Sequence, residues 1–109
     1  MDPRAMRRSF LAHFWAALRV VWPILSALLV VMVGLGVVVG RIEHWPLRDS
    51  LYFTFVSGLT IGYGDLVPKT LLARALAVAI GITGVLLSGL IAAVGVQALL
   101  AAAREGSER

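Results

Sequence analysis

Two long runs without a charged residue constrain this chain more than any other feature. No Asp, Glu, Lys or Arg occurs over residues 20–40 or over residues 75–103, which are 21 and 29 residues long. As helices these runs would extend about 31 Å and about 44 Å, and the hydrocarbon core of a bilayer is about 30 Å thick. Charged residues make up only 15% of the chain, against about 25% in soluble domains. The pattern predicts two membrane spans and excludes a water-soluble fold.

Basic residues stand directly before the first apolar run. They are Arg4, Arg7, Arg8 and Arg19, and such residues usually mark the cytoplasmic flank of a span. We therefore ascribe the net charge of +4 to membrane flanks and predict no nucleic-acid partner. The connection between the runs is also basic, so this signal is modest. It favours a cell (plasma or inner) membrane location with both termini cytoplasmic.

The connection between the two runs contains an apolar segment that is too short to cross. Residues 47–57 follow Pro46 and stop at Gly58, and Pro before a helix with Gly after it is the expected asymmetry. Eleven residues form a helix of about 16 Å, roughly half a bilayer. We expect this half-helix to dip into the membrane and return, shielded from lipid by protein or water.

A glycine-punctuated hexapeptide follows the half-helix. It reads Thr60-Ile61-Gly62-Tyr63-Gly64-Asp65. Glycine at every second position permits positive φ there, so that consecutive carbonyls can point the same way. A row of carbonyl oxygens suits a dehydrated monovalent cation and releases it readily. One chain would supply one wall, and a closed ring would need several copies around an axis.

The hexapeptide resembles the selectivity-filter signature of the potassium channel family, and it stands in the family's order of span, half-helix, filter and span. The resemblance implies a homotetramer in the lipid bilayer that conducts K⁺ passively. It implies that K⁺ is bound by the carbonyls of Thr60, Ile61, Gly62 and Tyr63 and by the Thr60 hydroxyl, with Gly64 completing the filter. Tyr63 would point away from the axis and pack behind the filter.

The expected fold is an all-α membrane protein with two transmembrane helices flanking a re-entrant pore helix and filter. We divide the chain into an amphipathic interfacial segment (1–19), a pore domain (20–103) and a cytoplasmic tail (104–109). Within the pore domain we expect an outer helix (20–40), a pore helix (46–58), the filter (60–65) and an inner helix (70–103).

The sequence departs from the family pattern behind the filter. Leu59 stands where many members carry a second Thr, and Val56 stands where some members carry a Glu that pairs with the residue matching Asp65. We therefore expect Asp65, at the outer mouth, to accept a hydrogen bond from the Tyr52 hydroxyl. A simply solvated Asp65 is the alternative.

The second apolar run carries small residues along one helix face. They are Ala77, Gly81, Gly84, Ser88, Ala92 and Gly95. Close helix packing is one interpretation, and a cavity-lining face with a bend point is the other. By resemblance Gly84 matches the family's hinge glycine, and we favour the second interpretation. We expect the cytoplasmic constriction near Ala92, Val96 and Leu100, where apolar side chains could close the path by dewetting.

Three functions are compatible with this pattern. The leading one is potassium-selective conduction, with gating at the inner helices, the filter or both. The alternatives are a nonselective cation channel of the same architecture and a small membrane adaptor that conducts nothing. We predict no enzyme, because no nucleophile, base or metal cluster converges in the sequence, and no cofactor beyond permeant K⁺.

Overall fold

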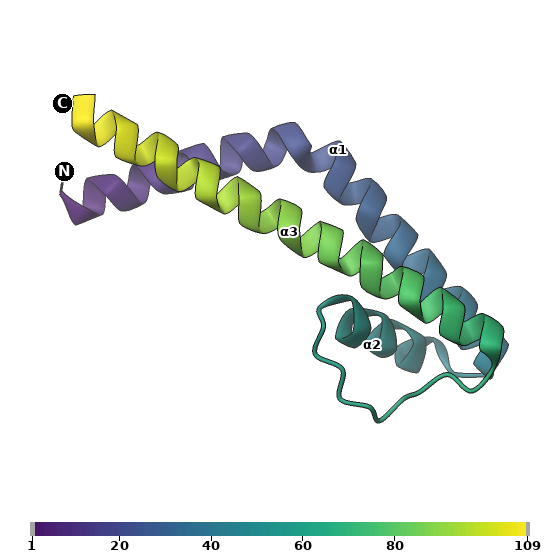
Figure 1. Ribbon diagram of the computed structural model, residues 1–109. Coiled ribbons are helices and arrows are strands. Elements are labelled where there is room, and N and C mark those ends of the chain that lie inside the picture. The colour runs from purple at the N-terminus through teal and green to yellow at the C-terminus, as the bar shows by residue number, and fades with distance from the viewer. Residues whose placement is uncertain (1, 109) are drawn as a thin grey trace. The chain divides into compact units, whose positions relative to one another are not determined.

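The computed structural model describes residues 2–108 and consists of helices and loops (Figure 1). Helix α1 covers Pro3–Glu43, α2 covers Leu47–Gly58 and α3 covers Leu71–Glu108. Two segments, Pro3–Glu43 and Leu71–Ser107, are long and apolar enough to cross a membrane. The predicted all-α fold, with a short helix between two candidate spans, is confirmed.

Helices α1 and α3 are longer than the two apolar runs from which they were predicted. Helix α1 begins at Pro3 and continues through Pro23, so the expected boundary between residues 19 and 20 is not a helix end. Helix α3 likewise continues through the expected tail to Glu108. Arg and Glu are good helix formers, and a proline interior to a helix removes one hydrogen bond without always ending it. Met1 and Arg109, the outermost residues of the two expected segments, lie outside the described residues.

The chain divides into two compact units, which are described separately. The central unit is Ser26–Ser88, and the terminal unit combines the residues up to Leu25 with those from Gly89 onward. Helices α1 and α3 contribute to both units. The division in α1 falls two residues after Pro23.

In the central unit, two hydroxyl side chains of α2 pack directly against two glycines of α1. A Cβ on Gly36 would lie 1.6 Å from Thr54 Oγ1, and a Cβ on Gly40 would lie 1.7 Å from Ser50 Oγ. Both pairs are spaced by four residues, so they match along the two helices. The small-residue pair of α1 therefore contacts the half-helix, and it lets the two backbones approach closely.

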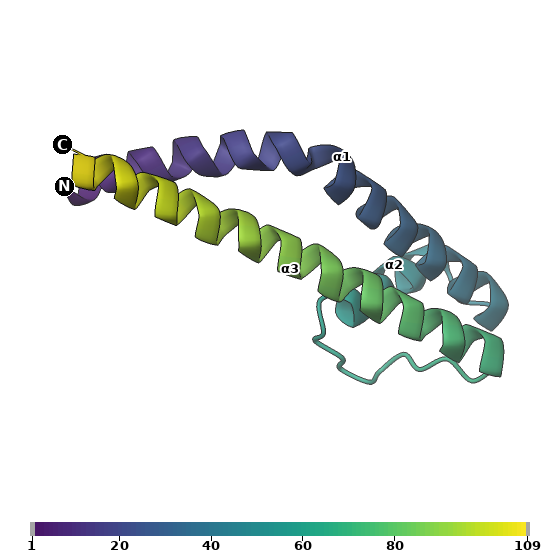
Figure 2. The same ribbon diagram turned by 45° about the horizontal axis from the view of Figure 1, so that its top comes forward.

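The hydroxyls enclosed by this contact are satisfied within α2. Thr54 Oγ1 donates to the Ser50 carbonyl at 2.6 Å, and Ser50 Oγ donates to the Pro46 carbonyl at 3.2 Å. Apolar side chains from all three helices surround the contact, and the buried ones are Met32, Val39, Phe53, Ala73 and Ile80. Helix α2 is thus held against α1 and α3 along its length, which positions the loop that follows it (Figure 2).

The Gly36 contact can be tested with a matched neighbour. We expect Gly36→Ala to lower the thermal stability of the purified protein, because the new Cβ meets Thr54 at Oγ1 and at its Cβ, 2.8 Å away. Overpacking of this kind costs about 1–3 kcal/mol. Gly34→Ala is the control, since nothing lies within 4 Å of its Cβ. Equal melting temperatures for the two variants would contradict the contact.

Both ends of the segment between α1 and α3 are fixed by hydrogen bonds. His44 has a φ of 61°, and Trp45 N donates to the Gly40 carbonyl at 2.8 Å, which closes α1 with a left-handed cap. Glu43 accepts hydrogen bonds from the backbone amides of Lys69 and Thr70, the latter at 3.1 Å. The carboxylate thereby satisfies donors at the start of α3 and suits its positive end.

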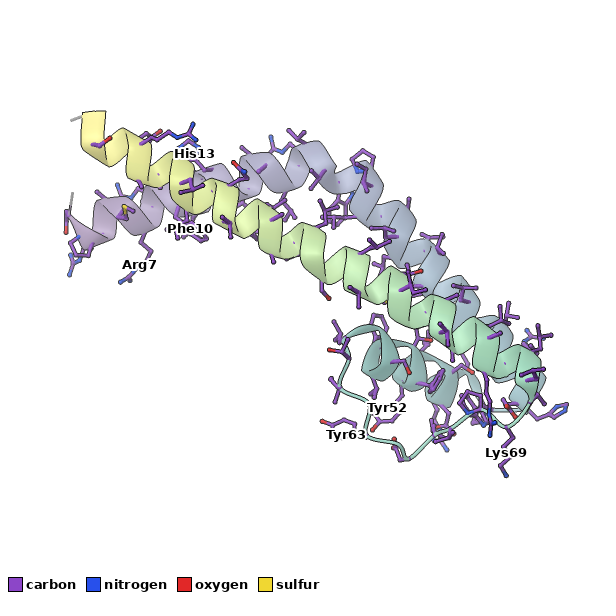
Figure 3. All side chains as sticks on the ribbon, in the orientation of Figure 1. Arg7, Phe10, His13, Tyr52, Tyr63 and Lys69 are labelled. Atoms are coloured by element: carbon purple, nitrogen blue, oxygen red, sulfur yellow. The ribbon has the colours of Figure 1, made fainter. Side chains whose placement is uncertain are left out.

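In the terminal unit, the N-terminal part of α1 lies beside the C-terminal part of α3 (Figures 1 and 2). Glu105 of α3 accepts a hydrogen bond from Ser9 Oγ at 2.5 Å, and its other oxygen lies 2.8 Å from His13 Nε2. Figure 3 shows His13 on the side of α1 that faces α3. Small buried side chains of α3, such as Ala98 and Ala102, share this unit.

Candidate functional site

At its start, the loop after α2 uses its backbone amides and leaves its carbonyls unpaired, whereas the amides of Tyr63 and Gly64 donate to no acceptor within residues 2–108. The amides of Ile61 and Gly62 both donate to the Val56 carbonyl, at 2.9 and 3.1 Å, and the Thr60 amide donates to the Ser57 carbonyl at 3.2 Å. Among residues 2–108, no hydrogen bond reaches the carbonyl oxygens of residues 60–64. The last turn of α2 therefore holds the start of the loop through the loop's amides. The loop's carbonyl oxygens remain available to accept from, or to coordinate, another partner.

Backbone conformation alternates along this loop. Thr60, Gly62 and Gly64 have φ values of 62°, 60° and 81°, whereas Ile61 and Tyr63 are not in the positive-φ region. The sequence predicted positive φ at the two glycines and not at Thr60. A β-branched residue in this region is strained by about 1–3 kcal/mol, and such strain concentrates at functional sites.

The side chain of Thr60 contributes to this turn. Its Oγ1 donates to the Leu59 carbonyl at 2.6 Å, which occupies the hydroxyl hydrogen and leaves the oxygen lone pairs available. Thr60 also borders an apolar groove of about 380 Å³ on α3, whose other lining residues are Val78, Gly81, Ile82, Val85 and Leu86. The end of the loop nearest α2 thus opens onto an uncharged surface.

Tyr52 of α2 interacts with Asp65 at the far end of the loop. Desolvation by the surrounding protein, followed by the proximity of the negatively charged Asp65 carboxylate, raises the pKa of the Tyr52 hydroxyl above its ordinary value. The hydrogen bond between the two side chains stays a prediction. A raised phenol pKa means that the hydroxyl stays protonated, and remains a donor, throughout the neutral range. Both side chains are exposed in the single chain, Tyr52 by 42%.

We expect Tyr52→Phe to make ion flux decay faster during sustained conduction, because Asp65 loses the donor that ties the loop to α2. The change is expected to be several-fold at most, since solvent screens an exposed pair. Asp65→Asn is the partner variant, and the double variant should decay no faster than either single one. Additive effects in this double-mutant cycle would show that the two groups act separately.

A hollow of about 250 Å³ lies between α2 and the loop. Val56, Ser57, Gly62 and Asp65 are among its lining residues. Tyr63 does not line it; its side chain is 69% exposed and projects away from the loop (Figure 3). In the single chain, most of the Tyr63 side chain contacts no protein, so close packing of this ring needs a second chain.

Gly84, the expected hinge, lies against the last residue of α2. A Cβ on Gly84 would lie 2.1 Å from the Gly58 carbonyl oxygen and 2.4 Å from Gly58 Cα. On the other side, a Cβ on Gly58 would lie 2.4 Å from Met32 Sδ. Gly58 is therefore enclosed between α1 and α3, two residues before Thr60. The close-packing interpretation of Gly84 has a specific partner, which is the pore-helix backbone rather than the outer helix.

The residues expected at the constriction lie in the terminal unit. Ala92, Val96 and Leu100 are exposed in the single chain, and they occupy the side of α3 opposite Val94 and Ala98, which are buried. This exposed apolar stripe is available to contact other chains.

Comparison with known proteins agrees with this geometry. The family described as "Ion channel" matches residues 11–101, a range that includes most of both candidate spans and all of α2 and the loop. The chain belongs to the ion channel family. Membership in this family places the chain among membrane transport proteins.

A relative of this ion channel chain is the two-pore potassium channel 3 of Arabidopsis thaliana. The two are 36% identical over 78 aligned residues, which cover 60% of this chain and 18% of the plant protein. The chain thus matches less than a fifth of that relative's length. No solved structure matches it significantly.

Sequence reasoning missed three features of the site. It did not identify the strained backbone of Thr60, the Val56 carbonyl that accepts two loop amides, or Gly58 as the meeting point of three helices. Gly58 was noted only as a helix end. The available signal was a glycine that ends a helix two residues before the hexapeptide, together with a second glycine in the middle of an apolar span.

Proposed function

We propose that this chain forms a homotetramer that conducts potassium selectively across the cell membrane. The carbonyls of Thr60, Ile61, Gly62 and Tyr63 line the ion path, and Gly64 and Asp65 form the outer mouth. The relative from Arabidopsis supports potassium as the ion, because its name assigns it to the potassium channels and the match includes 78 residues. Both termini lie on the cytoplasmic side, as the arginine-rich flank favours.

The observation that carries this proposal is that residues 60–62 have paired amides and unpaired carbonyls. Amides at 60–62 are paired with the end of α2, whereas no described donor reaches the carbonyls of residues 60–64. At membrane depth an unsatisfied backbone carbonyl costs several kcal/mol. Four such loops around an axis would satisfy these oxygens by binding a dehydrated cation, with dipoles weak enough to release it.

The orientation of α2 adds to the attraction for cations. Its C-terminal end carries the partial negative charge of a helix dipole, and the chain passes from Gly58 directly into the loop. The groove that Thr60 borders on α3 is apolar, so this dipole would be weakly screened.

The gate is placed on the exposed side of α3, near Ala92, Val96 and Leu100. Closure there would be a dewetting gate formed by these apolar side chains.

The test is ion flux in liposomes that contain the purified chain. With KCl inside and NaCl outside, we expect potassium efflux and a negative reversal potential, and block by barium, since a divalent ion leaves a ring of carbonyls more slowly. Equal permeability to potassium and sodium would favour the nonselective alternative. Absence of flux from correctly assembled protein would favour the adaptor.

A further inference from the structure

An exposed stripe of three arginines, two tryptophans and one leucine runs along the N-terminal part of α1. Its six members are spaced by 4, 3, 4, 4 and 3 residues, so at 100° per residue they fall within an arc of about 80°. They are Arg4, Arg8, Leu11, Trp15, Arg19 and Trp22. All six are exposed, Trp15 by 62% and Trp22 by 59%. We call this surface the Arg/Trp stripe.

The Arg/Trp stripe faces away from α3 within the terminal unit. Ser9 and His13, which contact Glu105 of α3, lie on the opposite side of α1. The half-buried side chains of Met6 and Ala17 fall on that same inner side. The N-terminal part of α1 therefore contacts α3 through the face that carries Ser9 and His13. The opposite face, which is the Arg/Trp stripe, remains available to a partner outside the chain.

The arginines of the stripe have no carboxylate partner in the described chain. The ion pair found among residues 2–108 joins His13 and Glu105, and the Asp2 carboxylate accepts from the Arg4 backbone amide rather than from a guanidinium. A guanidinium binds phosphate oxygens through parallel hydrogen bonds. Tryptophan, with an apolar body and one N–H donor, is enriched at the level of lipid headgroups.

Helix α1 does not need this segment to cross the membrane. Residues 20–43 alone extend about 36 Å, which exceeds the hydrocarbon thickness of about 30 Å. Pro23 lies inside α1 beside the division between the two units, and its missing N–H leaves the Arg19 carbonyl without its helical donor. A helix that bends there can place its N-terminal part along the membrane surface.

We propose that the Arg/Trp stripe binds anionic phospholipid headgroups of the leaflet next to the N-terminus. Arg8 and Arg19 hold the phosphate groups, and Trp15 and Trp22 insert between headgroups. Each arginine near an anionic surface contributes about fivefold to the local lipid binding constant. Binding is therefore selective for negative charge, and it is independent of the ion that the loop conducts.

The experiment measures which lipid contacts the two tryptophans in the reconstituted chain. Trp45→Phe leaves Trp15 and Trp22 as the remaining tryptophans and keeps an aromatic ring against Phe53. Liposomes contain phosphatidylglycerol and phosphatidylcholine in equal amounts, with brominated chains on one lipid or on the other. We expect stronger fluorescence quenching when phosphatidylglycerol carries the bromine.

Two comparisons make the result specific. The excess quenching should disappear in Arg8→Gln/Arg19→Gln and in about 1 M salt, where the screening length falls to about 3 Å. The control is Arg41→Gln/Arg48→Gln, which removes the same charge outside the stripe and should keep the excess. Native mass spectrometry of the chain with Trp45 intact gives an independent measure, as phosphatidylglycerol affinity should fall about 25-fold in the first variant only, about fivefold for each arginine removed.

Two results would overturn the proposal. Equal quenching by both brominated lipids would show contact with lipid regardless of charge. Absence of quenching by either lipid would show that a second copy of the chain, or another protein, covers the stripe.

Discussion

Gly62→Ala is expected to abolish potassium-selective flux. Gly62 has a φ of 60°, and an L-residue there costs about 1–2 kcal/mol, so four copies cost about 4–8 kcal/mol and lower the conducting population by more than about a hundredfold. The affected carbonyl belongs to the row that we assign to the ion. Potassium efflux from liposomes measures the loss directly.

The control for this variant is Gly89→Ala. Gly89 lies in α3, has no positive φ, and nothing lies within 4 Å of its Cβ. We expect its flux to be close to that of the unchanged chain. Normal selectivity in Gly62→Ala, with correct assembly, would mean that the loop does not line the ion path.

Gly84→Ala is expected to destabilise the central unit and to disturb the loop. Its Cβ would lie 2.1 Å from the Gly58 carbonyl oxygen and 2.5 Å from the Gly58 carbonyl carbon, and these backbone atoms cannot move aside as a flexible side chain can. Overpacking against backbone costs about 3 kcal/mol or more. Because Gly58 is two residues before Thr60, we expect both a lower melting temperature and altered potassium-to-sodium selectivity.

Gly81→Ala separates packing from bending at this place in α3. Gly81 is one turn away, and nothing lies within 4 Å of its Cβ, so alanine there stiffens the helix by about 1 kcal/mol without a clash. A pure hinge in this region predicts similar effects on opening for both variants, with selectivity intact. Contact with α2 predicts that only Gly84→Ala changes stability and selectivity.

The large-scale fold was predictable because its causes are local in the sequence. Hydrophobic runs longer than the bilayer is thick predict spans, and an apolar segment too short to cross between Pro46 and Gly58 predicts α2. The helix boundaries were less accurate. Loss of hydrophobicity at Arg19 and Arg104 does not end a helix, and the pattern of apolar residues stops before the backbone hydrogen bonds do.

At the candidate site, the sequence alone determined the hexapeptide and the alternating glycines, since these depend on residue identity and on the freedom of glycine to adopt positive φ. Only the tertiary structure decided which helices meet. It placed Gly36 and Gly40 against α2, enclosed Gly58 between Met32 and Gly84, and directed two loop amides to the Val56 carbonyl. In the sequence, small residues at helical spacing are compatible with packing against any of several helices. Which helix each glycine contacts is decided only when all three helices pack together and their backbones approach closely.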